Sequence, residues 1–192
     1  MRNRLSLLST AAIALLLAVP AVAQQSRPAG SQPQMSQQDM TFAKEAAVGG
    51  MAEVQLGQIA QQNAQDPQVK QFGARMVQDH GKANQELQSI ASGQNMQLPQ
   101  QLDQKHQQLY DRLSRMKGAE FDRAYMQAMT KDHDADVKAF RREAQTSRDP
   151  QLKQFAEQTL SVIEQHDKMA HDIDRSMTGS GSSRPPRHHT AR

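Results

Sequence analysis

The chain has 192 residues, of which 36% are hydrophobic and 4% aromatic, and it contains neither cysteine nor tryptophan. Its formal net charge is +3, but Arg2 and Arg4 lie in a segment that we expect to be removed, and without them about +1 remains. So small a charge and so few aromatic side chains argue against nucleic acid as a partner. The absence of cysteine excludes disulfides and a lipid anchor on an N-terminal cysteine.

The N-terminal segment is typical of a secretory signal peptide. Arg2 and Arg4 precede an apolar run over residues 5–19, and Ala21-Val22-Ala23 supplies a small-residue cleavage site. The run is shorter than the roughly 18 apolar residues expected of a membrane-spanning helix, so we interpret it as a signal peptide and not as an anchor. No later segment is apolar enough to span a membrane. We therefore predict cleavage after Ala23 and an exported protein, located in the periplasm or associated with the outer membrane.

The mature sequence predicts one folded domain with polar ends. Residues 24–36 are rich in Gln and Pro and predict a disordered leader, and residues 178–192 predict a disordered basic tail. His188 and His189 in that tail are interpreted as solvated. The residues between these ends, 37–177, suit a single domain.

Five helices are predicted in this domain, because long stretches are rich in Ala, Gln, Glu, Lys, Leu and Met and poor in β-branched runs. The first begins with Ser36 as its N-cap, and two later helices begin at Asp-Pro, where Asp caps the helix and Pro suits its first position. Two adjacent glycines, Gly49 and Gly50, are expected to permit close helix packing. The predicted helices cover residues 36–63, 67–91, 99–117, 119–146 and 150–177.

An internal repeat relates the second long helix to the fourth. The segment Asp66-Pro-Gln-Val-Lys-Gln-Phe72 differs at one position from Asp149-Pro-Gln-Leu-Lys-Gln-Phe155, so each Asp-Pro turn belongs to one of two similar hairpins. A connection of about 25 residues with its own helix joins the hairpins. This arrangement predicts an all-α, ferritin-like four-helix bundle of two repeated antiparallel hairpins, with a helical crossover between the second and third long helices. Phe72 and Phe155 are expected at equivalent buried positions.

Five stretches that cover nearly the whole domain carry a resemblance to a known family. They are FAKEAAVGGMAEVQLGQIA (42–60), RMVQDHGKANQEL (75–87), LPQQLDQKHQQLYDRL (98–113), FDRAYMQAMTKDHDADVKAF (121–140) and LKQFAEQTLSVIEQHDKMA (152–170). They resemble the bacterial envelope proteins of the domain-of-unknown-function family DUF4142, often labelled outer membrane proteins. The resemblance implies a ferritin-like fold and an envelope location, and it implies no established activity.

Each long helix places one polar side chain that can bind a metal on its apolar stripe. Two of these side chains are placed symmetrically about the Asp66-Pro67 turn, and two about the Asp149-Pro150 turn. A rise of about 1.5 Å per residue then puts all of them near the middle of the bundle, in one layer. The side chains are Glu53, His80, His133 and His166.

One carboxylate and three imidazoles predict a site for a single transition-metal ion, such as zinc, copper or iron. Asp79 and Asp132 directly precede two of the histidines and are expected to orient the ligands through hydrogen bonds. Ferritin-like di-metal proteins carry a Glu three residues before a ligand His, whereas this chain has Val77 and Ile163 at those positions. The sequence therefore argues against a carboxylate-bridged di-iron centre and its oxidative chemistry.

The alternative is a metal-free bundle, in which the same buried side chains satisfy one another by hydrogen bonds. The protein would then be a structural or protein-interaction module that meets an unknown envelope partner. No nucleophilic triad or glycine-rich phosphate loop stands out, so the sequence indicates a binding or protective role rather than an enzyme. Of the remaining histidines in the domain, His106 is expected to pack on the crossover and His171 to be exposed.

Overall fold

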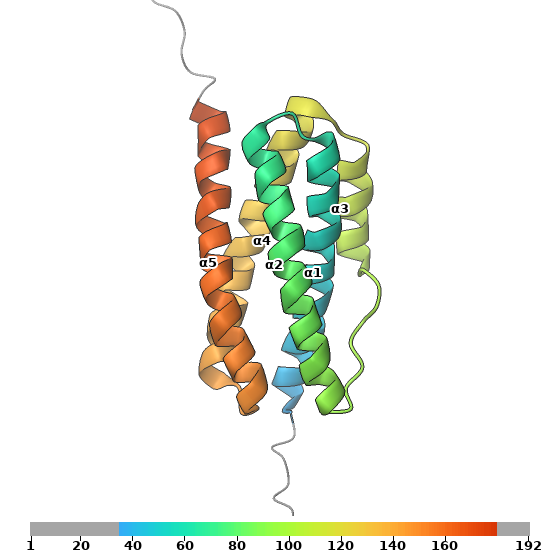
Figure 1. Cartoon of the computed structure of the whole chain (residues 1–192), viewed down its shortest axis with the longest axis vertical. Coiled ribbons are helices and arrows are strands. Elements are labelled where there is room, and N and C mark those ends of the chain that lie inside the picture. Colours follow the sequence, from blue (N-terminus) through green and yellow to red (C-terminus); the bar gives the residue numbers. More distant parts are fainter. Residues whose placement is uncertain (1–34, 180–192) are drawn as a thin grey trace, which may run out of the picture. The chain divides into compact units, whose positions relative to one another are not determined.

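The computed structural model describes residues 35–179, and its regular elements within that range are five α-helices, with no strand. The predicted signal peptide, the leader up to residue 34 and the tail from residue 180 lie outside the described residues. No helix of the described range is both long enough and apolar enough to cross a membrane. The helices are α1 (Gln37–Asn63), α2 (Pro67–Gly93), α3 (Gln104–Ser114), α4 (Gly118–Thr146) and α5 (Pro150–Gly179), as Figure 1 shows.

Side-chain caps fix where α1, α2 and α5 begin, whereas α4 begins without one. Ser36 Oγ accepts a hydrogen bond from the Asp39 backbone N–H at 3.1 Å, and Asp39 Oδ2 accepts one from the Ser36 N–H at 2.8 Å. This reciprocal capping box satisfies two backbone donors that a helix N-terminus would otherwise leave free. At the two Asp-Pro turns, Asp66 accepts from the Gln68 N–H and Asp149 from the Leu152 N–H, at 2.7 and 2.8 Å.

The observed boundaries differ from the predicted ones mainly in the crossover. Helix α3 begins at Gln104, five residues later than predicted, because the Asp103 side chain accepts from the His106 N–H at 2.8 Å and caps the helix there. It ends at Ser114, before the predicted residue 117. At the domain's ends, Met35 is buried in the core rather than part of a loose leader, and α5 continues to Gly179.

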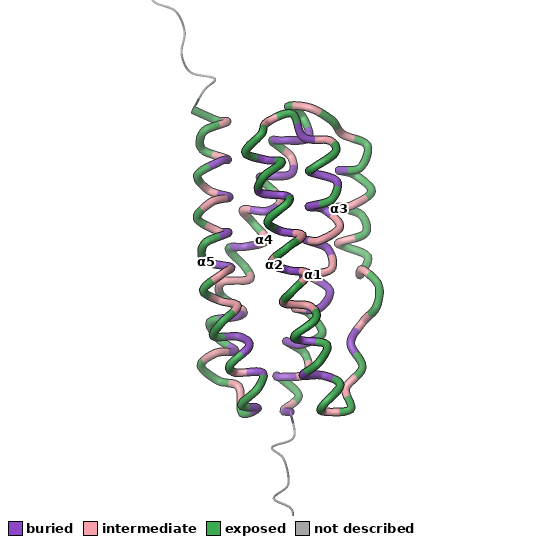
Figure 2. Tube along the Cα trace, in the orientation of Figure 1, coloured by how far each residue is buried: buried purple, intermediate pink, exposed green. Residues whose placement is uncertain are grey.

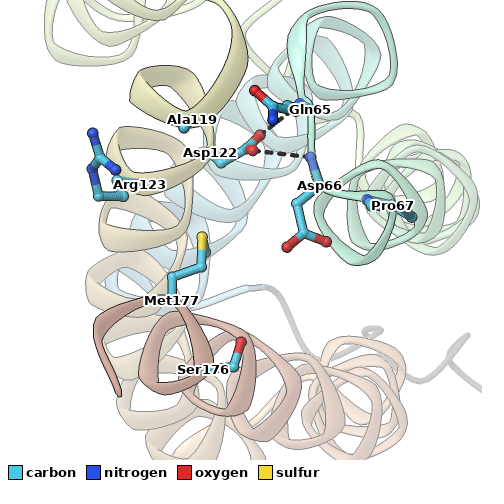
Figure 3. A pocket seen from close by; sticks show the side chains of 8 residues that line it. All are labelled: Gln65, Asp66, Pro67, Ala119, Asp122, Arg123, Ser176 and Met177. Carbon is cyan, nitrogen blue, oxygen red and sulfur yellow. Dashed lines mark hydrogen bonds between the residues drawn. The ribbon is translucent and has the colours of Figure 1, made fainter. Parts of the chain in front are cut away.

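The four long helices form two hairpins. Helix α1 packs along α2, helix α4 packs along α5, and α3 lies against α1 (Figure 1). At one end, the buried Asp122 near the start of α4 accepts backbone N–H bonds from Gln65 and Asp66 at 3.0 and 2.9 Å (Figure 3). At the other, Gln94 Nε2 donates to Asp149 Oδ2 at 2.7 Å, so the two Asp-Pro turns lie at opposite ends of the bundle.

The core consists of two apolar clusters, one toward each end, and the buried positions lie on the inner sides of the helices (Figure 2). One cluster contains Phe72 with Phe121 and Tyr125, and the other contains Phe155 with Phe42 and Phe140. Phe72 and Phe155 are 0% and 2% exposed, so the two halves of the sequence repeat each supply one buried ring, in different clusters.

Close approach of α1 and α2 depends on Gly57 and Gly73 and not on Gly49. A Cβ atom on Gly57 would lie 2.5 Å from the Gly73 carbonyl oxygen, and one on Gly73 would lie 2.6 Å from the Ala60 Cβ. A Cβ atom on Gly49 would meet nothing within 4 Å, and one on Gly50 would meet only the Asn84 side chain. The expectation that Gly49 permits close packing is therefore wrong.

Candidate metal centre

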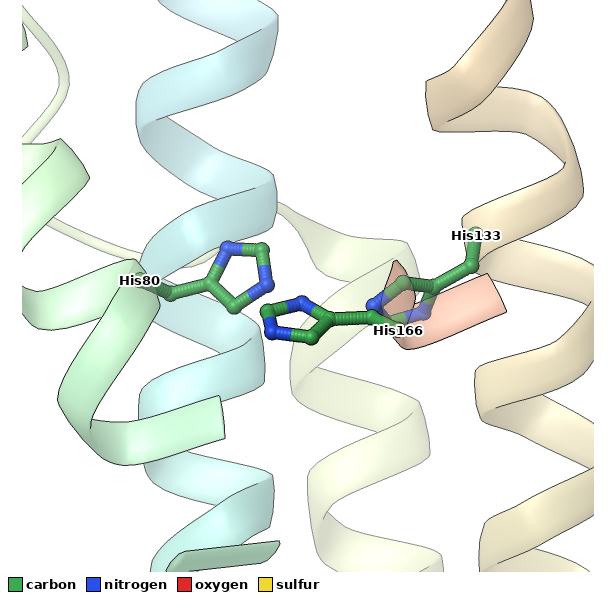
Figure 4. Close-up of side chains that lie close together, drawn as sticks. All are labelled: His80, His133 and His166. Atoms are coloured by element: carbon green, nitrogen blue, oxygen red, sulfur yellow. The ribbon is translucent and has the colours of Figure 1, made fainter. Parts of the chain in front are cut away.

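A polar layer separates the two apolar clusters. It consists of one side chain from each long helix, and all of them are almost completely buried: Glu53 on α1, His80 on α2, His133 on α4 and His166 on α5 are 1%, 5%, 0% and 0% exposed. The four side chains predicted from helical periodicity thus lie together. Figure 4 shows the three imidazole rings converging from three different helices.

Each of the three rings has one nitrogen fixed by an oxygen atom. His80 Nδ1 lies 2.7 Å from Glu53 Oε2, His133 Nδ1 lies 2.9 Å from the Met129 carbonyl oxygen, and His166 Nε2 lies 2.8 Å from Asp79 Oδ2. A neutral imidazole donates from one nitrogen and accepts at the other. The Met129 carbonyl can only accept, so His133 carries its proton on Nδ1, and the ionised Asp79 favours a proton on His166 Nε2.

The other nitrogen of each ring has no hydrogen-bond partner. These atoms are His80 Nε2, His133 Nε2 and His166 Nδ1, and all are buried. The three histidines each offer a ligand nitrogen within 4.8 Å of the other two, and their ring centroids are 5.3–5.8 Å apart. Three lone pairs without donors in one buried layer are unfavourable unless a cation or a water molecule binds them.

Burial sets the charge of this layer. It lowers the pKa of His80 to about 4, and it lowers the pKa of His166 to about 4 even though the bond to Asp79 acts in the opposite direction. Both rings are therefore neutral near pH 7, the state in which an imidazole can bind a metal. Burial also raises the pKa of Glu53 to about 8.

The carboxyl groups of Glu53 and Asp79 make contacts that differ from those predicted from the sequence. Glu53, predicted as a ligand, lies with Oε2 2.7 Å from His80 Nδ1, while its Oε1 lies 3.4 Å from His133 Nε2 without forming a hydrogen bond. Asp79 precedes His80 but orients His166. Arg75 on the same helix as Asp79 forms an ion pair with the Asp79 carboxylate at 3.1 Å. These contacts hold the pKa of Asp79 below its usual value, although burial alone would raise it.

Asp132 does not orient His133, because the Met129 carbonyl takes that position. It lies instead 3.9 Å from the Lys105 ammonium and belongs to a carboxylate group with Glu53 and Asp136. Asp136 was not among the predicted site residues, although it lies one helical turn from Phe140 on the apolar face of its helix. A charged residue on an apolar stripe was the available signal, the same signal that identified the histidines.

The remaining histidines of the described range are not part of the layer. His106 Nδ1 lies 2.7 Å from its helix cap, Asp103, and its side chain is 11% exposed. His171 is 37% exposed and lies 3.3 Å from Asp134 and 3.6 Å from Asp167 on the surface. This surface group also brings three ligand atoms within 4.8 Å of one another, without the burial of the polar layer.

A cavity connects the histidines with the outside. Its volume is about 160 Å³, it lies between α2 and α5, and its lining includes Asp79, His80 and His166. A larger cavity of about 540 Å³ lies at the end of the bundle beside Asp66 and Asp122 (Figure 3), far along the helices from the polar layer. The Asp122 carboxylate in it is already satisfied by two backbone N–H groups. The smaller cavity is therefore the one that bears on the site.

Comparison with known proteins places the chain in a family. Residues 24–173 match the family described as domain of unknown function DUF4142. The chain belongs to this family. The resemblance seen in the sequence is thereby confirmed, and no curated protein matches the chain.

Two solved structures are similar to this DUF4142 protein in fold. The "putative secreted protein DUF305 from Streptomyces coelicolor" is 15% identical, with a TM-score of 0.64 over 79% of this chain and 98% of the other. A DUF305 fragment from Deinococcus radiodurans is 13% identical, with a TM-score of 0.59 over 77% of this chain and 97% of the other. At such identities the likeness concerns the all-helical fold alone.

Proposed function

We propose that this DUF4142 protein binds one transition-metal ion through His80, His133 and His166, in an exported, ferritin-like bundle of the cell envelope. One observation carries the proposal: three buried imidazoles, each fixed by an oxygen at one nitrogen, leave their other nitrogens without partners in one layer. Imidazoles that ligate a metal are commonly held by an oxygen acceptor in this way, which fixes the tautomer and the ring orientation.

The ligand set favours particular ions. Imidazole nitrogens bind zinc, copper and iron, typically at about 2.0–2.1 Å for zinc. The ligand nitrogens lie within 4.8 Å of one another, so small side-chain movements would bring all three to bonding distance of one ion. Glu53 Oε1, which has no partner and lies 3.4 Å from His133 Nε2, is positioned to approach the same ion, and a water molecule or exogenous ligand would complete its coordination.

The role proposed is binding or protection rather than catalysis. The cavity beside His80 and His166 would let an ion reach the layer, and its modest size leaves little room for a large organic substrate. The signal-peptide pattern over residues 1–23 and the description of the Streptomyces coelicolor neighbour as secreted support the exported location. Binding and retaining a metal ion in the envelope is the function that these features support together.

Thermal unfolding with and without metal tests the proposal. The mature chain, stripped with a chelator, should be titrated with zinc, copper and iron in separate experiments. An ion at 100 times its Kd stabilises a protein by about 2.7 kcal/mol, which corresponds to an increase in Tm of roughly 5–11 °C for a domain of this size. Replacing His166 by Ala should abolish the increase.

His171→Ala is the matched control. It removes a histidine from the same helix, but from the surface, and it also disrupts the competing group with Asp134 and Asp167. It should retain the full metal-dependent increase in Tm. Because His166→Ala removes a fully buried ring, circular dichroism must first show that the variant is folded, and the metal content of the wild-type protein gives an independent test. If no ion raises the wild-type Tm, the metal-free structural module is the correct reading.

A further inference from the structure

A second group of potential ligands lies beside the histidines. Glu53 on α1 and both Asp132 and Asp136 on α4 each offer a carboxylate oxygen within 4.8 Å of the other two. Glu53 is 1% exposed, and Asp132 and Asp136 are partly buried. Three carboxylates this close repel one another strongly when ionised, and either bound protons or a bound cation relieves that repulsion.

The protein's own cations do not fill this role. Among the Lys and Arg side chains of the described residues, Lys105 of α3 pairs with this group, but its ammonium is 3.9 Å from Asp132 Oδ1 and its side chain is 75% exposed. So long and exposed a contact is weak. Repulsion from Glu53 and Asp132 adds to burial in raising the pKa of Asp136 well above its usual value, with only a partial opposing effect from Lys105.

An orphaned oxygen points to a ligand independently of the clustering. Glu53 Oε1 is buried and has no hydrogen-bond partner, even though its carboxylate is surrounded by polar groups. A cavity of about 20 Å³ is lined by Glu53, His80 and Asp136 among others, and it has room for one water-sized occupant. A buried carboxylate oxygen without a donor, next to a space of this size, is what a small cation requires.

A second opening gives access from the other side of the bundle. A cavity of about 440 Å³ is lined by Asp132 and Asp136 together with Lys105 and His106 of the crossover helix. It lies where α1, α3 and α4 come together (Figure 1), whereas the cavity beside His80 and His166 lies between α2 and α5. The two groups of ligands therefore have separate routes to solvent, and water in the larger cavity can complete the coordination of an ion bound to the carboxylates.

We propose that Glu53, Asp132 and Asp136 form a second cation site, which takes a hard divalent ion such as Mn²⁺. Carboxylate oxygens and water are the ligands that such ions prefer, whereas the three imidazoles favour zinc or copper. Glu53 is shared between the two sites, because its Oε1 lies 3.4 Å from His133 Nε2 and its carboxylate also lies within reach of both aspartates. This inference goes beyond the proposed function, since the carboxylate site can bind an ion whether or not the histidines do.

The experiment uses two ions of different preference. The chelator-stripped mature protein is titrated with Mn²⁺, with and without one equivalent of Zn²⁺ already added, and the electron paramagnetic resonance signal of free Mn²⁺ reports binding. One Mn²⁺ should bind per chain. Asp136→Asn is nearly isosteric and removes repulsion, so the metal-free variant should fold and melt no lower than the wild type, while its affinity for Mn²⁺ falls at least about tenfold.

Asp134→Asn is the matched control, because Asp134 lies midway between the two aspartates on the same helix but belongs to the surface group with His171. It should leave Mn²⁺ binding unchanged. Loss of Mn²⁺ binding in Asp134→Asn but not in Asp136→Asn would assign the ion to the surface and overturn the inference. Zinc binding without any Mn²⁺ binding would overturn it while leaving the proposed function standing. Mn²⁺ binding that depends on Asp136, in a protein that does not bind zinc, would support the second cation site and overturn the proposed function.

Discussion

Acidifying the metal-free protein should weaken its fold through His80 and His166. Burial lowers the pKa of each to about 4 in the folded protein, against 6.5 for an ordinary histidine. Between these pH values the two histidines are protonated in the unfolded chain but not in the folded one. The free energy of unfolding therefore falls as the pH drops from 6.5 toward 4. The stability contributed by the neutral rings is fully present only above pH 6.5.

The size of the effect follows from linkage. Between pH 6.5 and pH 4.5, each histidine costs about 2 kcal/mol of unfolding free energy, or about 4 kcal/mol for the pair. Glu53 acts in the opposite direction, because burial raises its pKa from 4.5 to about 8. The folded protein binds the Glu53 proton more tightly than the unfolded chain does. Acidification over the same interval therefore adds about 2 kcal/mol to the free energy of unfolding through Glu53. The net loss from the three groups is therefore about 2 kcal/mol, with the greatest stability near pH 6.5.

Urea denaturation in the presence of a chelator, at several pH values from 6.5 to 4.5, measures this loss. Other carboxylates also titrate in acid, so the decisive quantity is the difference between wild type and His166→Gln, which keeps a polar side chain but cannot be protonated in this range. The variant should lose about 2 kcal/mol less than the wild type over the interval. His171→Gln, which replaces a surface histidine of the same helix, should follow the wild type. Identical pH dependence in His166→Gln and wild type would refute the reasoning.

Three further outcomes are expected. Truncating Phe72 or Phe155 to Ala, at 0% and 2% exposure, should each lower the unfolding free energy by about 3–5 kcal/mol in chemical denaturation, and a loss below about 1 kcal/mol at either would contradict its burial. Gly57→Ala should destabilise the fold by roughly 1–3 kcal/mol, because its Cβ would meet a backbone oxygen at 2.5 Å. Gly49→Ala has open space around it and should stabilise the fold by up to about 1 kcal/mol. A higher Tm for Gly57→Ala than for Gly49→Ala would reject this account of the α1–α2 contact. Protein isolated from the envelope should begin at Gln24, and an intact mass that retains residues 1–23 would exclude cleavage.

The starts of the long helices and the membership of the polar layer could be predicted because both depend on local rules. An Asp-Pro pair specifies a helix start wherever it occurs, and periodicity of 3.6 residues specifies which face Glu53 or His80 lies on. Two residues at equal sequence distances from the same Asp-Pro turn then lie at the same height along the bundle axis. None of these inferences requires knowledge of how two helices rotate against each other.

The partners inside the layer could not be predicted, because they depend on side-chain rotamers and on small rotations of whole helices. Asp79 is adjacent to His80 in sequence, yet on a helix neighbouring residues point about 100° apart, so its carboxylate reaches across to His166 on α5 instead. The Met129 carbonyl displaced Asp132 for the related reason that a His side chain folds back toward the preceding turn of its own helix. The late start of α3 reflects a competition between Pro99 and Asp103 as starting points, which composition alone does not decide.

In the proposed metal site the ligands come from two hairpins, so the connection between the hairpins would contribute to metal affinity. An ion held by His80 on one side and by His133 and His166 on the other bridges hairpins that are joined covalently through residues 94–117. This tether sets the effective concentration at which one half of the site meets the other, on the order of millimolar for short flexible links. A proteolytic cut in the non-helical stretch before Gln104 would remove that advantage, and we expect a nicked protein to release its ion on dilution while an intact one retains it.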